Sequence, residues 1–164
     1  MGIFYKSYRI GKNGKPFFMY KIRTLKEGVD RSSSYAKDGQ YAWCGRFLRK
    51  HKADELPQFF NVLKGDISLV GPRAEEEKSL AVLPEDISEK LLSVKPGITS
   101  LSSIYFFDEE SFLRKVPNSA EVYWTKIKPI KLILDMFYIE NKSFSLDCWI
   151  LYATFKRVIK EIFK

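Results

Sequence analysis

The sequence is poor in cysteine and histidine, with two cysteines and one histidine in 164 residues. Cys44 and Cys148 lie far apart and His51 stands alone, so the ligand spacing of a zinc site is missing. Two distant cysteines also do not make the framework of a small disulfide-stabilised secreted domain, which favours a reducing, cytosolic setting. His51 lies in a run of basic residues, where an exposed side chain is the ordinary outcome, so it is assigned no role.

Long apolar runs are missing too. A helix that crosses a bilayer needs about 20 consecutive apolar residues, and the most apolar stretches are interrupted by charge at Lys131, Asp135, Lys156 and Arg157. No secretory signal peptide is recognisable. The chain as given is therefore expected to be soluble or peripheral to a membrane.

The length and composition predict one globular domain over residues 1–164, since 45% apolar and 29% charged residues are ordinary for a soluble protein. The net charge of +8 is unevenly spread. Residues 1–55 carry 13 Lys and Arg against five Asp and Glu, the acidic residues dominate 56–125, and 126–164 are basic again. A basic field favours anionic partners, namely nucleotides, nucleic acid or anionic lipid head groups, although solubility alone would also explain it.

Alternating apolar residues over 3–10 and 17–24, separated by the turn signal Asn13-Gly14, predict a β-hairpin. Residues 26–42 are polar and predict a loop, which either closes over a ligand or is a surface excursion. A short strand is expected over residues 67–70, and a loop over residues 95–99. The overall expectation is an α+β fold, a mostly helical single domain with an N-terminal hairpin and short strands.

Helices are predicted over 43–52, over 54–64, in two segments of 74–93, over 108–115 and 119–139 with an interruption near Pro129, and from 145 to the end. The second of these carries an apolar stripe that is expected to be buried, formed by Leu56, Phe59, Phe60 and Leu63.

Adjacent carboxylates, Asp54 and Glu55, follow the basic run at the expected start of a helix. Asp54 is expected to cap that helix, and the helix dipole and Arg49 are expected to keep it ionised. An ionised carboxylate can attack phosphorus, and Glu55 could hold Mg²⁺, a cation that prefers carboxylate and phosphate oxygens. Taken alone, however, an Asp-Glu pair at a helix start is usually only a cap.

Basic residues elsewhere in the chain could bind the phosphate that such a carboxylate would attack. Arg73 follows Gly71-Pro72 in a turn that would hold its guanidinium for bidentate phosphate binding, with a surface salt bridge as the alternative. Lys21 lies on one face of the expected hairpin and either binds anions or is merely solvated. The last helix has an apolar stripe flanked by basic residues, which suits either a membrane interface or packing on the core.

Together these motifs resemble the bacterial sugar transferase family, the monotopic polyprenyl-phosphate phosphoglycosyl transferases. The resemblance covers nearly the whole chain through segments 9–17, 20–24, 48–49, 54–58, 61–66, 68–73 and 95–99, followed by Asp135, Tyr138, Asn141, Ser143 and Asp147. Three features depart from the family pattern. The hydrophobic re-entrant helix that precedes this region in the family is not seen here, the family's Pro-Arg-Pro ends in Ala74, and Ser100-Leu101 replaces Gly-Trp. Ala74 in place of the second proline predicts a looser turn. Ser100-Leu101 lies in a region that bears on sugar choice.

The resemblance implies transfer of a sugar-1-phosphate from a nucleotide diphosphate sugar, often a UDP-sugar, to undecaprenyl phosphate. This reaction initiates bacterial polysaccharide or glycoconjugate synthesis at the cytoplasmic face of the inner membrane and needs Mg²⁺. By the same resemblance Asp54 is the nucleophile, Glu55 contributes to the metal site, and Arg49, Arg73 and Lys21 bind phosphate. A homodimer is left open.

Two other readings remain at this stage. A truncated chain could be a non-catalytic interaction or regulatory paralogue, because the membrane segment is not seen. A basic, aromatic-rich chain could also bind nucleic acid, but nothing in it matches a nucleic-acid-binding motif and the carboxylate pair would repel phosphates unless metal-bound, so no nucleic acid partner is expected.

Overall fold

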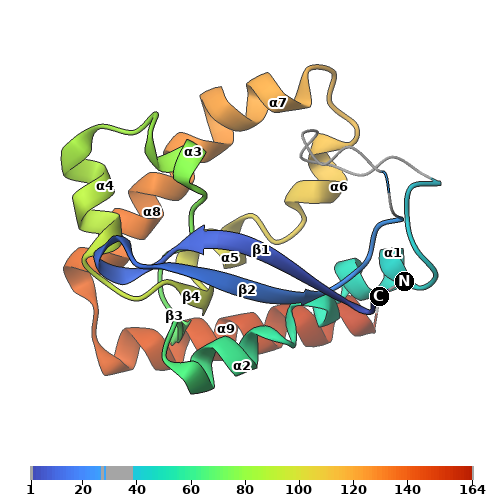
Figure 1. Cartoon of the computed structure of the whole chain (residues 1–164), viewed down its shortest axis with the longest axis horizontal. Helices are drawn as coiled ribbons and strands as arrows, with labels where there is room; N and C mark the ends of the chain where they lie inside the picture. The colour runs from blue at the N-terminus through green and yellow to red at the C-terminus, as the bar shows by residue number, and fades with distance from the viewer. Residues whose placement is uncertain (1, 27, 29–38, 164) are drawn as a thin grey trace.

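The computed structural model describes residues 2–26, 28 and 39–163. It begins with an antiparallel hairpin of β1 (Phe4–Ile10) and β2 (Pro16–Ile22), which crosses the middle of the molecule in Figure 1. The turn between the strands is a single 3₁₀ turn, η1 (Lys12–Gly14), with φ of 57° at Asn13 and 72° at Gly14. Asn and Gly tolerate this left-handed conformation better than other residues, so the hairpin prediction is confirmed. Most of the predicted loop 26–42 lies outside the described residues.

Short helical elements follow the hairpin. They are α1 (Gly45–Lys50), the 3₁₀ turn η2 (Ala53–Glu55) and α2 (Gln58–Lys64). The basic helix predicted over 43–52 is therefore confirmed as α1. The helix predicted to start at Asp54 instead begins at Gln58, with Gly65 ending it at φ 81° as expected.

Two short parallel strands form the centre of the fold. β3 (Ser68–Val70) pairs with β4 (Gly97–Thr99), and the crossover between them carries α3 (Glu77–Leu80) and α4 (Glu85–Leu92). The strand over 67–70 and the two helices are confirmed, whereas the prediction of a loop at 95–99 is wrong. Three strand residues bounded by Pro96 are too few to show a periodic signal, and a parallel partner 29 residues away is invisible locally.

The C-terminal half is helical. Its elements are α5 (Leu101–Tyr105), α6 (Glu109–Leu113), α7 (Ser119–Val122), the π-helical segment η3 (Tyr123–Ile127), α8 (Lys128–Asn141) and α9 (Phe144–Ile162). The interruption expected near Pro129 is the π-helical segment, which ends just before it. Ser100 and Ser143 cap α5 and α9, each accepting a hydrogen bond from the backbone N–H three residues on, at 3.0 and 3.3 Å.

Two apolar clusters lie on either side of β3. The first contains Phe17, Met19, Ile67 and Ala74, and so joins the hairpin to the turn before α3. The second contains Val70, Tyr138 and Ile150, and joins β3 to α8 and α9. Tyr138 also donates a hydrogen bond of 2.8 Å to Asp147, which ties α8 to α9. The α+β, mostly helical architecture predicted from the sequence is confirmed.

The apolar stripe of α2 is exposed, contrary to prediction. Leu56, Phe59, Phe60 and Leu63 are 58%, 50%, 63% and 83% exposed. The inward face carries Gln58 and Asn61 instead, and Asn61 is fully buried. Asn61 accepts from the Tyr20 N–H at 3.1 Å and donates to Phe18 O at 2.8 Å, so an amide side chain satisfies the free edge of β2. The periodicity was helical, but it did not reveal which face is buried.

Candidate active site

Asp54 and Glu55 lie on the tight turn η2 between α1 and α2, against strand β2. Backbone bonds of the i to i−3 type connect Glu55 to Lys52 and Leu56 to Ala53, at 3.2 and 3.3 Å. Pro57 has no N–H to donate, which favours this tighter pattern over an α-helical start. Asp54 is therefore not the expected helix cap, and its side chain makes no capping bond.

Glu55 is held by a lysine from the hairpin. Lys21 Nζ, on β2, donates to Glu55 Oε1 at 2.8 Å, and both side chains are largely buried. Burial alone would raise the pKa of Glu55, but the charges of Lys21 and Arg73 and the hydrogen bond from Lys21 outweigh it and lower the pKa to about 2. Glu55 is thus a permanent anion at neutral pH. The structure thus brings Lys21, which the sequence offered as an anion-binding residue, to Glu55.

Asp54 is buried beside this anion, with 7% exposure. Burial raises its pKa, and the neighbouring charge of Glu55 raises it further, while Lys21, Arg49 and Lys52 act in the opposite direction without cancelling the rise. The helix dipole and cations were expected to favour the ionised form of Asp54, but the net shift of its pKa is upward because burial and Glu55 outweigh the cations. No hydrogen bond or ion pair reaches its carboxylate from any residue that the structure describes, which leaves both oxygens free to react with a ligand.

Arg73 follows β3 and lines the same cavity as Glu55. Its burial works to lower its pKa, but the charges of Glu55, Tyr123 and Glu109 raise the pKa overall, so it is a fixed cation. Over the described part of the chain, its side chain makes no ion pair or hydrogen bond. The alternative of a surface salt bridge is thus not what the structure contains. A guanidinium without such a contact, next to Glu55 at the cavity, is well suited to a phosphate group.

The position of Arg73 depends on two glycines. A Cβ on Gly97 would lie 2.1 Å from Gly71 N, and a Cβ on Gly71 would lie 2.5 Å from Lys95 O. Because no side chain fits between the strands here, Gly71 and Gly97 let β3 and β4 pack closely and direct the turn after β3 toward the dyad. Ala74, where a looser turn was expected, is buried in the first apolar cluster.

Arg49 is engaged elsewhere. Its Nη1 lies 3.4 Å from Glu110 Oε1 on α6, and this carboxylate also accepts hydrogen bonds of 2.9 Å from Tyr41 and Arg114. Arg49 still acts on Asp54 through its charge. The structure therefore brings Arg49 near the dyad but pairs it with an acidic residue that the sequence analysis did not single out.

Lys21, Glu55 and Arg73 line one small cavity, together with Gln58 and Ser103. Its apolar wall comes from the core below, including Met19 and Ala74. Asp54 precedes Glu55 on the turn at this cavity. The cavity itself provides one carboxylate, two cations and a hydroxyl, which can bind an anion, and Asp54 is the neighbour of that carboxylate in the chain.

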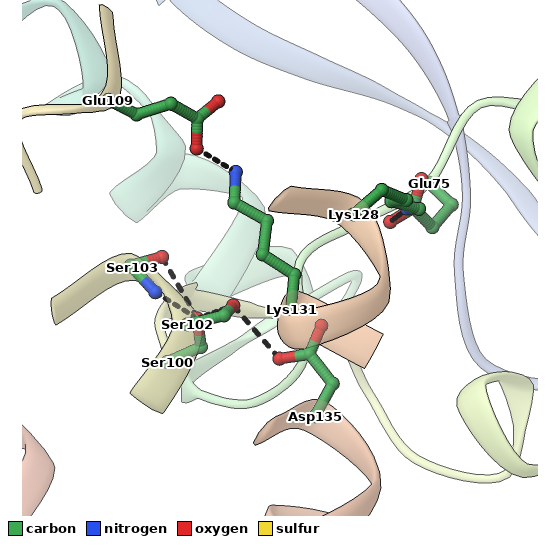
Figure 2. A network of polar contacts seen from close by, with 8 residues as sticks. All are labelled: Glu75, Ser100, Ser102, Ser103, Glu109, Lys128, Lys131 and Asp135. Atoms are coloured by element: carbon green, nitrogen blue, oxygen red, sulfur yellow. Dashed lines mark hydrogen bonds and ion pairs between the residues drawn. The ribbon is translucent and has the colours of Figure 1, made fainter. Parts of the chain in front are cut away.

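A second polar network includes Ser103, which also lines this cavity (Figure 2). Lys131 on α8 pairs with Glu109 and lies over the rings of Phe106 and Tyr123, while Lys128 pairs with Glu75. Ser102 donates a hydrogen bond of 3.0 Å to Asp135, which is buried. Burial raises the pKa of Asp135 to about 7, against the hydrogen bond from Ser102 and the charges of Lys128 and Lys131. The sequence analysis did not predict these contacts. The run of three acidic residues at 108–110 was the one local signal that could have pointed to ion pairs here.

A magnesium site is not preformed. Within the described ranges, no group of three or more His, Cys, Asp or Glu side chains comes together. Glu55 offers one carboxylate whose Oε1 already accepts from Lys21, and Asp54 is next to it. Mg²⁺ is commonly held by one or two carboxylates with water and substrate phosphates supplying the other ligands. The residues present fit that mode of binding, in which the substrate completes the site.

The sequence matches the family described as Bacterial sugar transferase over residues 1–161. The chain belongs to this family. Its similarity to the EpsL protein of Bacillus subtilis, named as an uncharacterized sugar transferase, is 37% identity over 158 residues, covering 96% of this chain and 70% of EpsL. This bacterial sugar transferase therefore shares nearly its whole length with relatives, as the sequence motifs implied.

Two relatives are named for an activity. One is the UDP-N-acetylgalactosamine-undecaprenyl-phosphate N-acetylgalactosaminephosphotransferase of Aeromonas hydrophila, 32% identical over 92% of this chain and 34% of the relative. Another is the UDP-glucose:undecaprenyl-phosphate glucose-1-phosphate transferase of Klebsiella pneumoniae, 34% identical over 97% of this chain and 33% of the relative. The sugar transferase chain thus spans about a third of these two proteins. Their names agree on the lipid phosphate and differ in the sugar.

The surface of this bacterial sugar transferase carries a large apolar face on α9. Its exposed members are Phe144, Trp149, Leu151, Tyr152, Phe155, Ile159, Ile162 and Phe163. Lys156 and Lys160 flank them, and α9 lies along the lower edge of Figure 1, as does α2 with its exposed stripe. In the described residues, no helix is both long and apolar enough to span a bilayer.

Proposed function

We propose that this chain transfers a sugar-1-phosphate from a nucleotide diphosphate sugar, with UDP-sugars as the first candidates, to undecaprenyl phosphate through a covalent intermediate on Asp54. The proposal is carried by one observation: in a member of this family, Glu55, Lys21 and Arg73 line one cavity, and Asp54 precedes Glu55 on the same turn. The names of the relatives support the lipid acceptor and the type of transfer. The sugar itself is set by residues that differ between them.

Two displacements at one phosphorus account for the reaction. In the first, an Asp54 carboxylate oxygen attacks the phosphorus that carries the sugar, and the bond to the nucleoside monophosphate breaks as that group leaves with the electron pair. In the second, an oxygen of undecaprenyl phosphate attacks the same phosphorus, and the bond to Asp54 breaks. The carboxylate is regenerated and no net proton change is required.

The surrounding charges suit this sequence. Arg73 and Lys21 can bind the phosphate oxygens on which negative charge gathers, which offsets the repulsion that the anion of Glu55 would otherwise exert. The raised pKa of Asp54 makes its carboxylate a more basic nucleophile than an ordinary aspartate. Glu55 is the residue that would hold Mg²⁺ with the substrate's phosphates, and the ion would neutralise phosphate charge.

The acceptor is a lipid, so the chain must work at a membrane surface. The exposed apolar face of α9 and its flanking lysines support docking of this helix on an anionic bilayer. The proposed place of action is the cytoplasmic face of the bacterial inner membrane, because nucleotide sugars are cytoplasmic. A homodimer is compatible with this arrangement and is tested by the mass of the detergent-solubilised protein.

The activity is tested by supplying the chain with Mg²⁺, undecaprenyl phosphate in nanodiscs and a panel of UDP-sugars, and by measuring UMP release. Wild type should release UMP with one or a few sugars, and Asp54→Asn should lose at least about a thousandfold in rate because the nucleophile is gone. Asp86→Asn, which changes an exposed carboxylate on α4 outside the cavity, serves as the control for altered charge. Near-normal turnover by Asp54→Asn would overturn the assignment. Absence of product with every sugar would favour a non-catalytic chain.

A further inference from the structure

A continuous chain of hydroxyl groups runs from the buried carboxyl of Asp135 to Ser103 (Figure 2). Ser102 Oγ lies 3.0 Å from Asp135 Oδ1, Ser100 Oγ lies 2.9 Å from Ser102 Oγ, and Ser103 Oγ lies 2.9 Å from Ser100 Oγ. Ser100 and Ser102 are 1% and 2% exposed, so water does not replace these contacts. Ser103 is partly exposed and lines the cavity with Lys21, Glu55 and Arg73.

Each contact between two oxygens at this distance needs one proton, and each serine has only one to give. When Asp135 is ionised, Ser102 must donate to it. Ser100 must then donate to Ser102, and Ser103 must donate to Ser100. The Ser103 proton is used up inside the protein, and only its lone pairs face the cavity.

Protonation of Asp135 at Oδ1 reverses every bond. Asp135 donates to Ser102, Ser102 donates to Ser100, and Ser100 donates to Ser103. Ser100 can accept this bond because one of its two acceptor positions is filled by the Ser103 N–H at 3.0 Å and the other becomes free. The Ser103 hydroxyl proton is then available to the cavity. One proton enters from solvent at Asp135, and three O–H bonds rotate.

We propose that Ser103 is a substrate-contacting residue of the transferase and that Asp135, acting through Ser102 and Ser100, is the positioning residue that sets whether Ser103 donates or accepts a hydrogen bond there. This rests on the proposed function, in which the cavity receives a phosphate-bearing sugar nucleotide. A phosphate oxygen only accepts hydrogen bonds. Binding of the nucleotide sugar is therefore stronger when Asp135 is protonated.

The charges around Asp135 and its burial together keep its pKa within the physiological range. Glu75, on the segment before α3, favours the protonated form, and Lys128 and Lys131 on α8 favour the ionised form. Those lysines are themselves paired with Glu75 and Glu109. The group on α5 that contacts Asp135 is the Ser102 hydroxyl. Burial is the largest influence and brings the pKa of Asp135 to about 7.

The ligand-free protein gives the first test, by nuclear magnetic resonance. The Ser103 amide reports on Ser100, its acceptor, and the ¹³C shift of the Asp135 carboxyl reports its protonation. Between pH 5 and 8.5 both signals should titrate with one midpoint in wild type. The Ser103 amide should lose that titration in Asp135→Asn and in Ser102→Ala, which cuts the chain but keeps the cap of α5. Ser93→Ala, a serine outside the chain, should behave as wild type. A flat Ser103 amide in wild type while the Asp135 carboxyl titrates, or an Asp135 that does not titrate in this range, would overturn the proposal.

Kinetics give the second test and separate the hydrogen bond from simple charge repulsion. KM for the nucleotide sugar should rise about tenfold from pH 6 to pH 8.5, the effect of one hydrogen bond of about 1.4 kcal/mol to a charged group. In Ser102→Ala, Asp135 loses the hydrogen bond that lowers its pKa and ionises at higher pH. With the carboxyl ¹³C shift recording that ionisation, the change in KM per Asp135 ionised measures repulsion alone and should be markedly smaller. An equal rise in both proteins would overturn the proposal. If no nucleotide sugar reacts at any pH, the proposed function fails, while the resonance test still decides on the hydroxyl chain.

Discussion

Lys21 Nζ contacts Glu55 Oε1 at 2.8 Å, and this ion pair gives two adjacent carboxylates opposite properties. The pKa of Glu55 falls to about 2, whereas the pKa of Asp54 rises because it is buried next to that fixed negative charge. Glu55 is an anion held by Lys21, and Asp54 is a more basic carboxylate to which no described residue donates a hydrogen bond. Such separation of neighbouring carboxyl groups is characteristic of sites in which the two have distinct chemical roles.

Removal of Lys21 should destabilise the fold in a pH-dependent way. Since the folded pKa of Glu55 lies below its unfolded value of about 4.5, the pair contributes stability above pH 4.5 that is lost as pH falls through about 2. Lys21→Met should cost about 2 kcal/mol at pH 7 and clearly less at pH 3, with Lys21→Arg largely retaining wild-type stability. Chemical denaturation at both pH values measures this. A cost that does not change with pH would mean that Lys21 acts through packing alone.

Replacement of Asp135 should produce the opposite pH trend. Its folded pKa of about 7 lies above the unfolded value of about 3.9, so its contribution to stability is fully present below pH 3.9 and is lost as pH rises through 7. The stability of wild type relative to Asp135→Asn should therefore fall by up to about 3 kcal/mol between pH 4 and pH 8. Parallel stability curves for the two proteins would show that this carboxyl does not titrate as stated.

Alanine at Gly97 should disrupt the central strand pair. The new Cβ would lie 2.1 Å from Gly71 N, and backbone atoms on both sides leave it no room. We expect a loss of about 3 kcal/mol or more in unfolding free energy, together with displaced Arg73 and reduced activity. Gly2→Ala, whose Cβ would be 3.9 Å from Phe4 O, is the matched control and should be neutral. Wild-type stability of Gly97→Ala would refute the close approach of the strands.

Docking on a membrane is expected to depend on α9. The protein should float with vesicles that contain phosphatidylglycerol, and less so as salt rises, because charge attraction is screened. Phe155→Ser and the double change of Lys156 and Lys160 to Gln should each weaken flotation severalfold. Val82→Ser, an exposed apolar residue between α3 and α4, should not. Undiminished flotation of all variants would place the lipid contact elsewhere.

Local signals in the sequence were enough to predict the hairpin, α1, α4 and the start of α9. Asn13-Gly14 can adopt the left-handed turn, Pro84 precedes α4, and Ser143 caps α9, so each element carries its own boundary. The dyad, Lys21 and Arg73 were singled out because their residue types and order resemble the family, and the structure places Lys21, Glu55 and Arg73 at one cavity, while their roles stay predictions. The residues that mark each of these elements and motifs lie within a few positions of it in the sequence.

What could not be predicted depends on contacts between distant parts of the chain. Asn61 bonds to strand residues more than 40 positions away, and only this contact decides that α2 turns its polar face inward. Glu110 meets Arg49 and Tyr41 across about 60 residues or more. The shift in the pKa of Asp54 likewise arises from burial, which charge spacing alone does not reveal.

The most direct test of the account is chemical quenching of the full-length protein within milliseconds of mixing with Mg²⁺ and a reactive nucleotide sugar, without lipid acceptor, followed by mass spectrometry of its peptides. A sugar-phosphate adduct should be found on Asp54, should disappear when undecaprenyl phosphate is added, and should not form in Asp54→Asn. An adduct on another side chain, or UMP released stoichiometrically with no adduct at any time, would contradict the account.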